Sequence, residues 1–430
     1  MSAEQQANPF RPIAAGRAPI ALVLSGGGAR GAYEAGIVRY LREELPASTR
    51  ERVHFDILCG TSVGAVTACL LAATMDTPDQ QGRILTELWS GLSLERVYKV
   101  EGENLWSLTR KMWRAATNEP VRAEGWRLYD VFHPEPLEEM VRTRPSWPAI
   151  SQNLARGLFS ALSVTATEIA TGNSVVFVQR AQGGVPPWSR DPSSEARAAI
   201  IGPEHALASS AIPLLFRSVK IGQEFFCDGS LRQTTPLSPA LRLGAHKVLL
   251  ISLKYRPPEG KRRRRALDVY PTTPLLMGKV LNALMLDHTD YDLDRLRRFN
   301  SLLEAGRELF GDSFVQKIND VVQQGRGQAY RVVEDLVIRP SRDIATIAAA
   351  HAKRARTGEV APRSLPAKLL HRIAQSHLVT EADLASYLLF DGAYAADLIS
   401  LAMEDAHRQR ESLIRFFEPS ADPLAVELAR

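Results

Sequence analysis

Gly60-Thr61-Ser62-Val63-Gly64 is the stretch of this chain that most constrains its fold. It has the pattern G-x-S-x-G and lies between two apolar segments. Residues 53–59 before it have the composition of a short strand, and residues 63–75 after it that of a buried helix. A strand, a tight turn and a helix form the context in which a nucleophile elbow presents a reactive serine. Because the pattern is common, it also fits a small-residue turn without chemistry.

The residue types within the turn favour the catalytic interpretation. Gly60 and Gly64 leave room for a sharp bend because they carry no Cβ. Ser62 would then lie at a helix N-terminus, where unpaired N–H groups and the helix dipole stabilise negative charge. We therefore predict that Ser62 is the nucleophile and that the two glycines shape the elbow.

A second turn of this kind follows the first predicted strand, residues 20–25. That strand leads into Gly26-Gly27-Gly28-Ala29-Arg30-Gly31 and then into an amphipathic helix. Consecutive βα units usually place their strands side by side. We expect the N–H groups of this turn to point at a carbonyl attacked by Ser62, forming an oxyanion hole. Arg30 would add a positive charge nearby.

The same glycines allow a different interpretation. Gly26, Gly28 and Gly31 satisfy G-x-G-x-x-G, the dinucleotide-binding pattern, which also needs an acidic residue at the end of the second strand. In this chain the second strand ends in Cys59-Gly60-Thr61-Ser62, and its acid, Asp56, lies in the middle. A nucleotide site is therefore disfavoured.

Composition indicates a globular protein without membrane spans. The chain has 430 residues, of which 45% are hydrophobic and 23% charged, and no stretch approaches the roughly 18 apolar residues of a membrane span. Residues 1–17 lack an apolar signal core, so we expect a cytoplasmic protein with a disordered leader. Cys59, Cys69 and Cys227 have neither disulfide nor zinc-ligand spacing.

The net charge of +5 is concentrated in one run. Residues 261–265, Lys-Arg-Arg-Arg-Arg, carry five positive charges, which leaves the rest of the chain formally neutral. This distribution argues against nucleic-acid binding. The run is either a solvated loop or a contact for anionic lipid headgroups, at about 1 kcal/mol per basic residue.

The pattern of apolar residues in the middle of the chain predicts a hairpin, a helix and two further strands. The strands are expected over residues 158–167, 175–178, 225–227 and 247–252, with a loop over 182–197 and a helix over 204–211. The strand at 225–227 delivers Asp228-Gly229-Ser230. An Asp-Gly pair is usually a turn, but a strand end would also place Asp228 at the same sheet edge as Ser62, where it could act as a base.

Five of the six tryptophans fall within residues 76–147. They are Trp89, Trp106, Trp113, Trp126 and Trp147. Core packing accounts for most of them, and the alternative is a surface that lines an acyl chain.

These motifs together resemble the patatin-like phospholipases. The family's G-G-G-x-[KR]-G corresponds to Gly26, Gly27, Gly28, Arg30 and Gly31, and its elbow to Gly60, Ser62 and Gly64. Its D-G-G or D-G-A motif appears as Asp228-Gly229-Ser230, with Ser230 in place of glycine or alanine. The stretch 208–213 also resembles the segment that precedes this motif. The resemblance covers about residues 18–255.

The resemblance implies an α/β fold with three layers, in which helices flank a mostly parallel sheet and a helical extension follows at the C-terminus. It implies a catalytic dyad of Ser62 and Asp228, an acyl-enzyme, a phospholipid or other acyl-ester substrate, and no metal or other cofactor. We expect a catalytic core over residues 18–256, an insertion over 257–330, and a last strand with C-terminal helices over 331–430.

Two alternatives remain open at this point. The first is a conventional Ser-His-Asp esterase, for which His205 and His246 are the histidines nearest to Asp228 in the sequence. The second is a catalytically silent member of the family that binds lipid or a partner.

Overall fold

The computed structural model describes residues 18–97, 135–181, 184–186, 188, 192–213, 216–257, 289–311, 313–326, 329–356 and 385–419. Several sequence predictions lie outside the described residues: the leader, the basic run 261–265 and three of the five tryptophans. The sequence also predicts amphipathic helices over 365–377 and 381–389, of which the first and residues 381–384 of the second lie outside the described residues.

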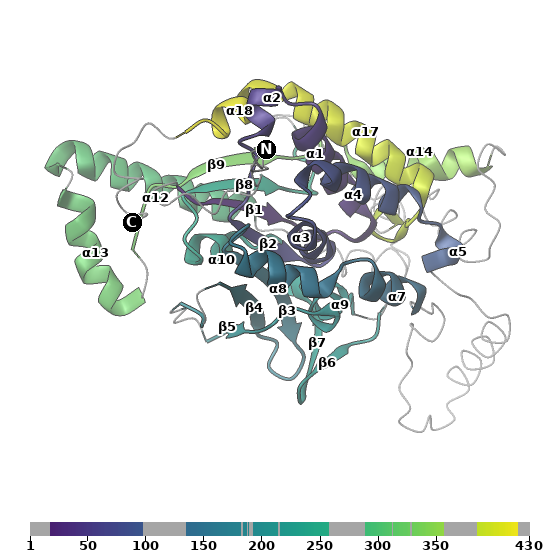
Figure 1. Cartoon of the computed structure of the whole chain (residues 1–430), viewed down its shortest axis with the longest axis horizontal. Helices are drawn as coiled ribbons and strands as arrows, with labels where there is room; N and C mark the ends of the chain where they lie inside the picture. The colour runs from purple at the N-terminus through teal and green to yellow at the C-terminus, as the bar shows by residue number, and fades with distance from the viewer. Residues whose placement is uncertain are drawn as a thin grey trace, which may run out of the picture.

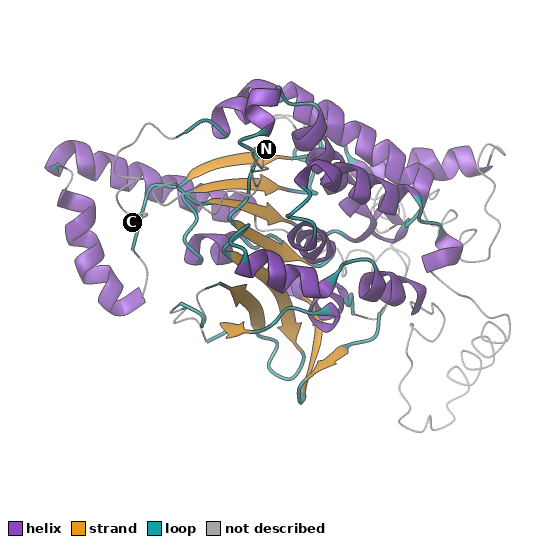
Figure 2. Ribbon diagram, viewed as in Figure 1, coloured by secondary structure: helices purple, strands orange, loops and turns teal. Residues whose placement is uncertain are grey.

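The described strands form one sheet, shown in orange in Figure 2. Its order is β5-β4-β3-β2-β1-β8-β9, and β7 also pairs with β3 while β6 pairs with β7. The strands β3, β2, β1, β8 and β9 are parallel to one another. The strand bounds are β1 Ile20–Leu24, β2 Ile57–Thr61, β3 Ala161–Glu168, β4 Ser174–Arg180, β5 Ser194–Ala198, β6 Val219–Ile221, β7 Glu224–Asp228, β8 Lys247–Ile251 and β9 Glu334–Ile338.

Helices cover both faces of this sheet (Figure 1). On one face α1 packs against α4 and α17, and α3 lies beside them over the sheet, whereas α10 and α12 cover the other face. The helix bounds are α1 Ala32–Glu43, α2 Ala47–Arg50, α3 Val63–Ala73, α4 Gln81–Ser90, α5 Leu94–Val97, α7 Glu135–Thr143, α8 Trp147–Ala155, α9 Pro203–Ser210, α10 Leu237–Arg242, α12 Thr289–Phe310, α13 Ser313–Arg326, α14 Ile344–Arg356, α17 Gly392–Arg408 and α18 Arg410–Phe416.

The alternation of side chains along β1 explains why both faces are covered. Leu22 and Leu24 belong to the core under α1 and α3, while Ala21 and Val23 belong to the core under α10 and α12. Successive strand residues point to opposite faces, so an apolar run such as this needs helices on both sides. The expected three-layer α/β fold with a mostly parallel sheet is confirmed.

The sheet brings the ends of β2 and β7 together. Along one edge of β3, Thr61 of β2 is opposite Thr165, and Asp228 of β7 is opposite the next residue, Ala166. The other edge of β3 is paired with β4. Because β2 runs parallel to β3 and β7 antiparallel, their carboxyl ends meet. Ser62 and Asp228 therefore come together end to end rather than on neighbouring parallel strands.

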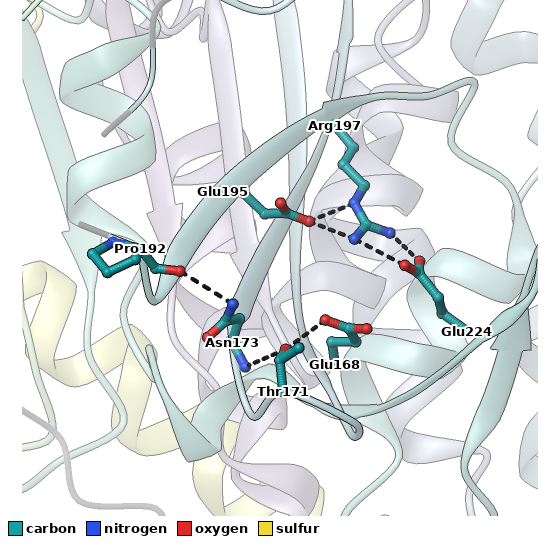
Figure 3. A network of polar contacts seen from close by, with 7 residues as sticks. All are labelled: Glu168, Thr171, Asn173, Pro192, Glu195, Arg197 and Glu224. Atoms are coloured by element: carbon teal, nitrogen blue, oxygen red, sulfur yellow. Dashed lines mark hydrogen bonds and ion pairs between the residues drawn. The ribbon is translucent and has the colours of Figure 1, made fainter. Parts of the chain in front are cut away.

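The loop predicted over 182–197 is wrong at its end, where β5 forms. This strand pairs in parallel with β4 at the margin of the sheet. Figure 3 shows the polar contacts around it: Arg197 of β5 binds Glu195 and also Glu224 of β7, and Asn173 Nδ2 donates to the carbonyl of Pro192 at 3.1 Å. The sequence Ser-Glu-Ala-Arg-Ala has little apolar character, so cross-strand pairing and these contacts, rather than burial, hold β5.

The chain returns to the sheet after a helical excursion. Helices α12 and α13 separate β8 from β9 in the sequence, yet these two strands are paired neighbours. The boundaries proposed for a core, an insertion and a C-terminal part stay a prediction. Among the described helices, each is too short or too polar to cross a lipid bilayer.

Candidate active site

Ser62 occupies a strained turn between β2 and α3. Its φ is 55° and its ψ −126°, and it is the one non-glycine residue with positive φ in the described part of the chain. Such a conformation costs about 1–3 kcal/mol and persists only where the surroundings enforce it. A Cβ on Gly60 would lie 2.2 Å from the carbonyl oxygen of Gly64, and one on Gly64 2.5 Å from that of Leu24. The two glycines are thus needed for close backbone approach.

Asp228 lies against the hydroxyl of Ser62. The Ser62 Oγ donates to Asp228 Oδ2 at 2.6 Å, and both side chains are buried. The other carboxylate oxygen, Oδ1, accepts the backbone N–H of Ser230 at 2.7 Å. One oxygen is therefore held by the turn after β7, and the other faces the serine. This is the geometry that a base needs to take a proton from Ser62.

The environment of Asp228 adjusts its proton affinity. Burial raises the pKa of this carboxyl from its ordinary value of 3.8 to about 6, although hydrogen bonds from Ser62 and Ser230 act in the opposite direction. A base works best when its pKa lies near the working pH. Asp228 is therefore deprotonated at neutral pH yet more basic than an exposed aspartate.

This pKa predicts the acid limb of the pH profile. If Asp228 must be ionised, kcat/KM should fall about tenfold per pH unit below about pH 6, because the protonated carboxyl cannot accept the Ser62 proton. Initial rates with a soluble aryl ester over a pH series measure this. The pH at the midpoint of this fall in kcat/KM should change little on warming, because the pKa of a carboxyl group depends less on temperature than that of an imidazole. A rate that stays flat down to about pH 4 contradicts the assignment.

Ser209 joins Ser62 to the neighbouring strand. Its Oγ accepts the backbone N–H of Ser62 at 2.8 Å and donates to the carbonyl of Thr165 at 2.6 Å. Two residues on, the carbonyl of Ala211 accepts the N–H of Asp228 at 2.9 Å. The C-terminal end of α9 therefore binds the backbone of both Ser62 and Asp228 and sets their separation. The sequence predicted a helix over 204–211 and a likeness of 208–213 to the family, but not these contacts.

Ser209→Ala should slow turnover without weakening substrate binding. The change leaves the buried Ser62 N–H without an acceptor, at a cost of about 1–3 kcal/mol, and lets the strained turn relax. We expect kcat to fall about 10- to 100-fold with KM unchanged. Ser163→Ala is the matched control, since Ser163 is equally buried on β3. An equal loss in both variants, or a loss confined to KM, contradicts a positioning role.

The glycine-rich turn has three backbone donors that remain available. The Gly26 N–H donates to the carbonyl of Thr234 at 2.8 Å, and the Arg30 N–H to that of Gly27 at 3.2 Å. These two therefore do not fit the predicted oxyanion hole as donors. The N–H groups of Gly27, Gly28 and Ala29 have no acceptor among the described residues. The turn lies close to the serine, since a Cβ on Gly26 would be 3.1 Å from Ser62 Cβ.

The comparison with protein families decides the identity of this fold. A sequence model of the patatin-like phospholipases matches residues 22–241, slightly more than half of the chain. The match contains the glycine-rich turn, Ser62 and Asp228. The chain belongs to the patatin-like phospholipase family.

Two solved structures are similar to this patatin-like chain at low identity. VipD from Legionella pneumophila is 12% identical, with 90% of this chain and 92% of that chain covered and a TM-score of 0.27. The heterodimeric ExoU–SpcU complex from the type III secretion system of Pseudomonas aeruginosa is 18% identical, with 92% and 76% covered and a TM-score of 0.26. No curated protein sequence matches the chain.

An apolar pocket opens beside Ser62 in this patatin-like fold. Its cavity volume is about 70 Å³, and the space reaches about 830 Å³ only when the open solvent at its mouth is included. Its apolar lining includes side chains of four helices and one strand together with the segments that connect them: Val63, Val66 and Leu70 of α3, Leu85, Leu88 and Trp89 of α4, Leu137, Met140 and Val141 of α7, Leu207 of α9, Val219 of β6, and Leu92, Ala211, Ile212, Phe216 and Phe390. Of the described tryptophans, Trp89 lines this pocket, and it is also buried in the core as most of the tryptophans were expected to be. A pocket with an apolar lining of this kind suits a hydrocarbon chain.

The histidines of the triad alternative lie elsewhere. The Nδ1 of His205 accepts the N–H of Gly202 at 3.1 Å, and its ring packs edge-on against Phe177. Burial and the nearby charge of Arg331 lower the pKa of His246 to about 4. In the described part of the chain no histidine hydrogen-bonds to Ser62 or Asp228.

No metal site accompanies these residues in the part of the chain that the structure describes. There, no group of three or more His, Cys, Asp or Glu side chains is placed to hold a metal ion. The three cysteines are buried and unpaired, and burial raises the pKa values of Cys59 and Cys227 to about 12 and about 11.

Proposed function

We propose that this chain is a lipid acyl hydrolase that cleaves phospholipid or related fatty acyl esters with a Ser62–Asp228 dyad. The observation that carries the proposal is the 2.6 Å hydrogen bond from Ser62 Oγ to Asp228 Oδ2 at a strained elbow. The apolar pocket beside the serine supports a fatty acyl group as the part of the substrate that binds there.

The reaction follows from the positions of these atoms. Ser62 Oγ attacks the ester carbonyl while Asp228 Oδ2 takes its proton, and the oxyanion forms near the N–H groups of Gly27, Gly28 and Ala29. The C–O bond to the alcohol then breaks, and Asp228 returns the proton to the departing oxygen. Water, deprotonated by Asp228, releases the fatty acid from Ser62 and restores the hydroxyl.

The test is fatty-acid release from vesicles of mixed phospholipids, combined with labelling by a fluorophosphonate. Stoichiometric labelling of the wild-type protein together with release of fatty acid is the expected result. Labelling without release from any lipid would limit the proposal to a serine hydrolase of other esters. The absence of both would favour the silent, lipid-binding alternative.

Contact with anionic membranes is a separate part of the proposal. It rests on the five basic residues at 261–265, which lie outside the described residues. Clusters of consecutive basic residues attract the anionic headgroups of a membrane surface.

A further inference from the structure

Residues 385–392 run from the glycine-rich turn to α4, although they are distant from both in the sequence and lie outside the range matched by the family. Arg30 Nε and Nη2 donate to Ser386 Oγ at 2.8 and 2.6 Å. The Arg30 guanidinium carbon also lies 3.8 Å from the ring centroid of Tyr387. The guanidinium is therefore used to bind this segment, which makes it a poor candidate for binding the oxyanion.

Gly28 accommodates the same segment. Its φ is 56°, and a Cβ there would lie 2.4 Å from the carbonyl oxygen of Tyr387. Glycine is thus required both by the backbone conformation and by the neighbouring carbonyl. The turn that carries the free N–H groups is consequently packed against residue 387.

The far end of the segment is fixed to α4 and the loop after it. The Gly392 N–H donates to the carbonyl of Leu92 at 2.9 Å, and a Cβ on Gly392 would lie 2.2 Å from the carbonyl of Ser90. Asp391 caps α17 by accepting the N–H groups of Ala393 and Tyr394. Since α17 packs along α1, the position of residues 385–392 is set by the main helical layer (Figure 1).

Phe390 lies between these two attachments and faces the pocket. Its ring stacks on Trp89, with ring centroids 6.1 Å apart and an interplanar angle of 6°. Both rings line the pocket beside Ser62, and Phe390 is the one described lining residue that comes from beyond residue 241. The other described lining residues lie within the range that the family model matches, and Phe390 contributes an aromatic side chain from outside it.

We infer that Phe390 limits the length of the acyl chain that the pocket accepts, and that Arg30 is a positioning residue that holds the Phe390 segment on the glycine-rich turn. This inference rests on the proposed hydrolase function. Removal of the Phe390 ring should leave more space for the acyl chain next to Trp89. In an apolar pocket, one additional methylene group changes kcat/KM by about tenfold or more.

The first experiment compares acyl-chain preference in Phe390→Ala and Leu389→Ala. Leu389 is a matched control because it is adjacent and 1% exposed but does not line the pocket. With p-nitrophenyl esters of a medium and a long fatty acid, the long-to-medium ratio of kcat/KM should rise about tenfold in Phe390→Ala and stay unchanged in Leu389→Ala. Phe390→Leu, the milder change, should give an intermediate ratio.

An unchanged ratio in both Phe390 variants would overturn the inference, as would an equal shift in Leu389→Ala. Neither result would affect the hydrolase proposal, which fails separately if the wild type cleaves neither ester. If Phe390→Ala does not fold, Phe390→Leu decides the question.

The second experiment tests the role of Arg30. Arg30→Lys keeps the positive charge but loses the planar group that contacts Ser386 and stacks on Tyr387. We expect Arg30→Lys and Ser386→Ala to shift the long-to-medium ratio in the same direction as Phe390→Ala. Full retention of the wild-type rate and ratio by Arg30→Lys would show that the charge alone matters and would contradict the positioning role.

Discussion

Ser62→Ala is expected to abolish both fluorophosphonate labelling and fatty-acid release. The hydroxyl at this position is the one that donates to Asp228 and lies next to the glycine-rich turn, so its loss removes the bond-forming atom. Removing a catalytic serine from a dyad or triad lowers kcat by about 10⁴- to 10⁶-fold. Labelling followed by peptide mapping, together with hydrolysis of phospholipid vesicles, measures both effects.

The control for this variant is a serine of nearly equal burial that does not hydrogen-bond to Ser62 or Asp228. Ser163→Ala on β3 meets that condition and should label at the wild-type rate. Labelling that persists in Ser62→Ala would place the nucleophile elsewhere. Hydrolysis that persists without labelling would mean that the measured activity does not pass through an acyl-Ser62 intermediate.

Asp228→Asn is expected to have the second largest effect, a loss of about 10³- to 10⁴-fold in kcat. Asparagine has nearly the same shape and can still accept the Ser230 N–H, but its amide cannot take the proton of Ser62. The loss should persist across the pH range, and the acid limb near pH 6 should disappear with it. Rates with soluble and vesicular substrates measure both.

The same substitution carries a prediction about stability. In the folded protein the pKa of Asp228 is raised from 3.8 to about 6 by burial, so the native state binds a proton more tightly than the unfolded chain. The stabilisation of the folded state by this tighter proton binding is fully present below about pH 4 and is lost as the pH rises through about 6. At pH 7 the ionised carboxylate is a cost, and Asp228→Asn should have an equal or higher Tm than the wild type.

Residual activity near the wild-type level in Asp228→Asn would contradict the dyad. That result would favour a histidine base, and the activities of variants with single substitutions of His205 and His246 would then test the triad alternative. A large loss of activity with a lowered Tm would instead indicate that the variant is misfolded. The predicted combination, an inactive protein of undiminished stability, separates catalysis from folding.

The strongest sequence signals were those in which neighbouring residues decide the structure. The βα turns at Gly26–Gly31 and Gly60–Gly64 could be predicted because glycines between an apolar strand and a helix act locally. The alternation of Leu22 and Leu24 with Ala21 and Val23 likewise determined a strand buried on both faces. Asp228 was found through its place after an apolar strand and through the family resemblance. Each of these inferences depends on contacts within a few residues or on a fixed motif.

Only the tertiary structure decided how these parts meet. That β7 approaches β2 end to end along β3 depends on strand pairing across more than 150 residues, which periodicity does not encode. The use of Ser209 as the acceptor for the Ser62 N–H, and of Arg30 as the anchor for residues 385–390, follows from packing between distant segments. Polar side chains such as these have many possible partners, and the fold selects one. The sequence therefore determined which groups are available for chemistry, and the tertiary structure decided which of them are brought together around Ser62.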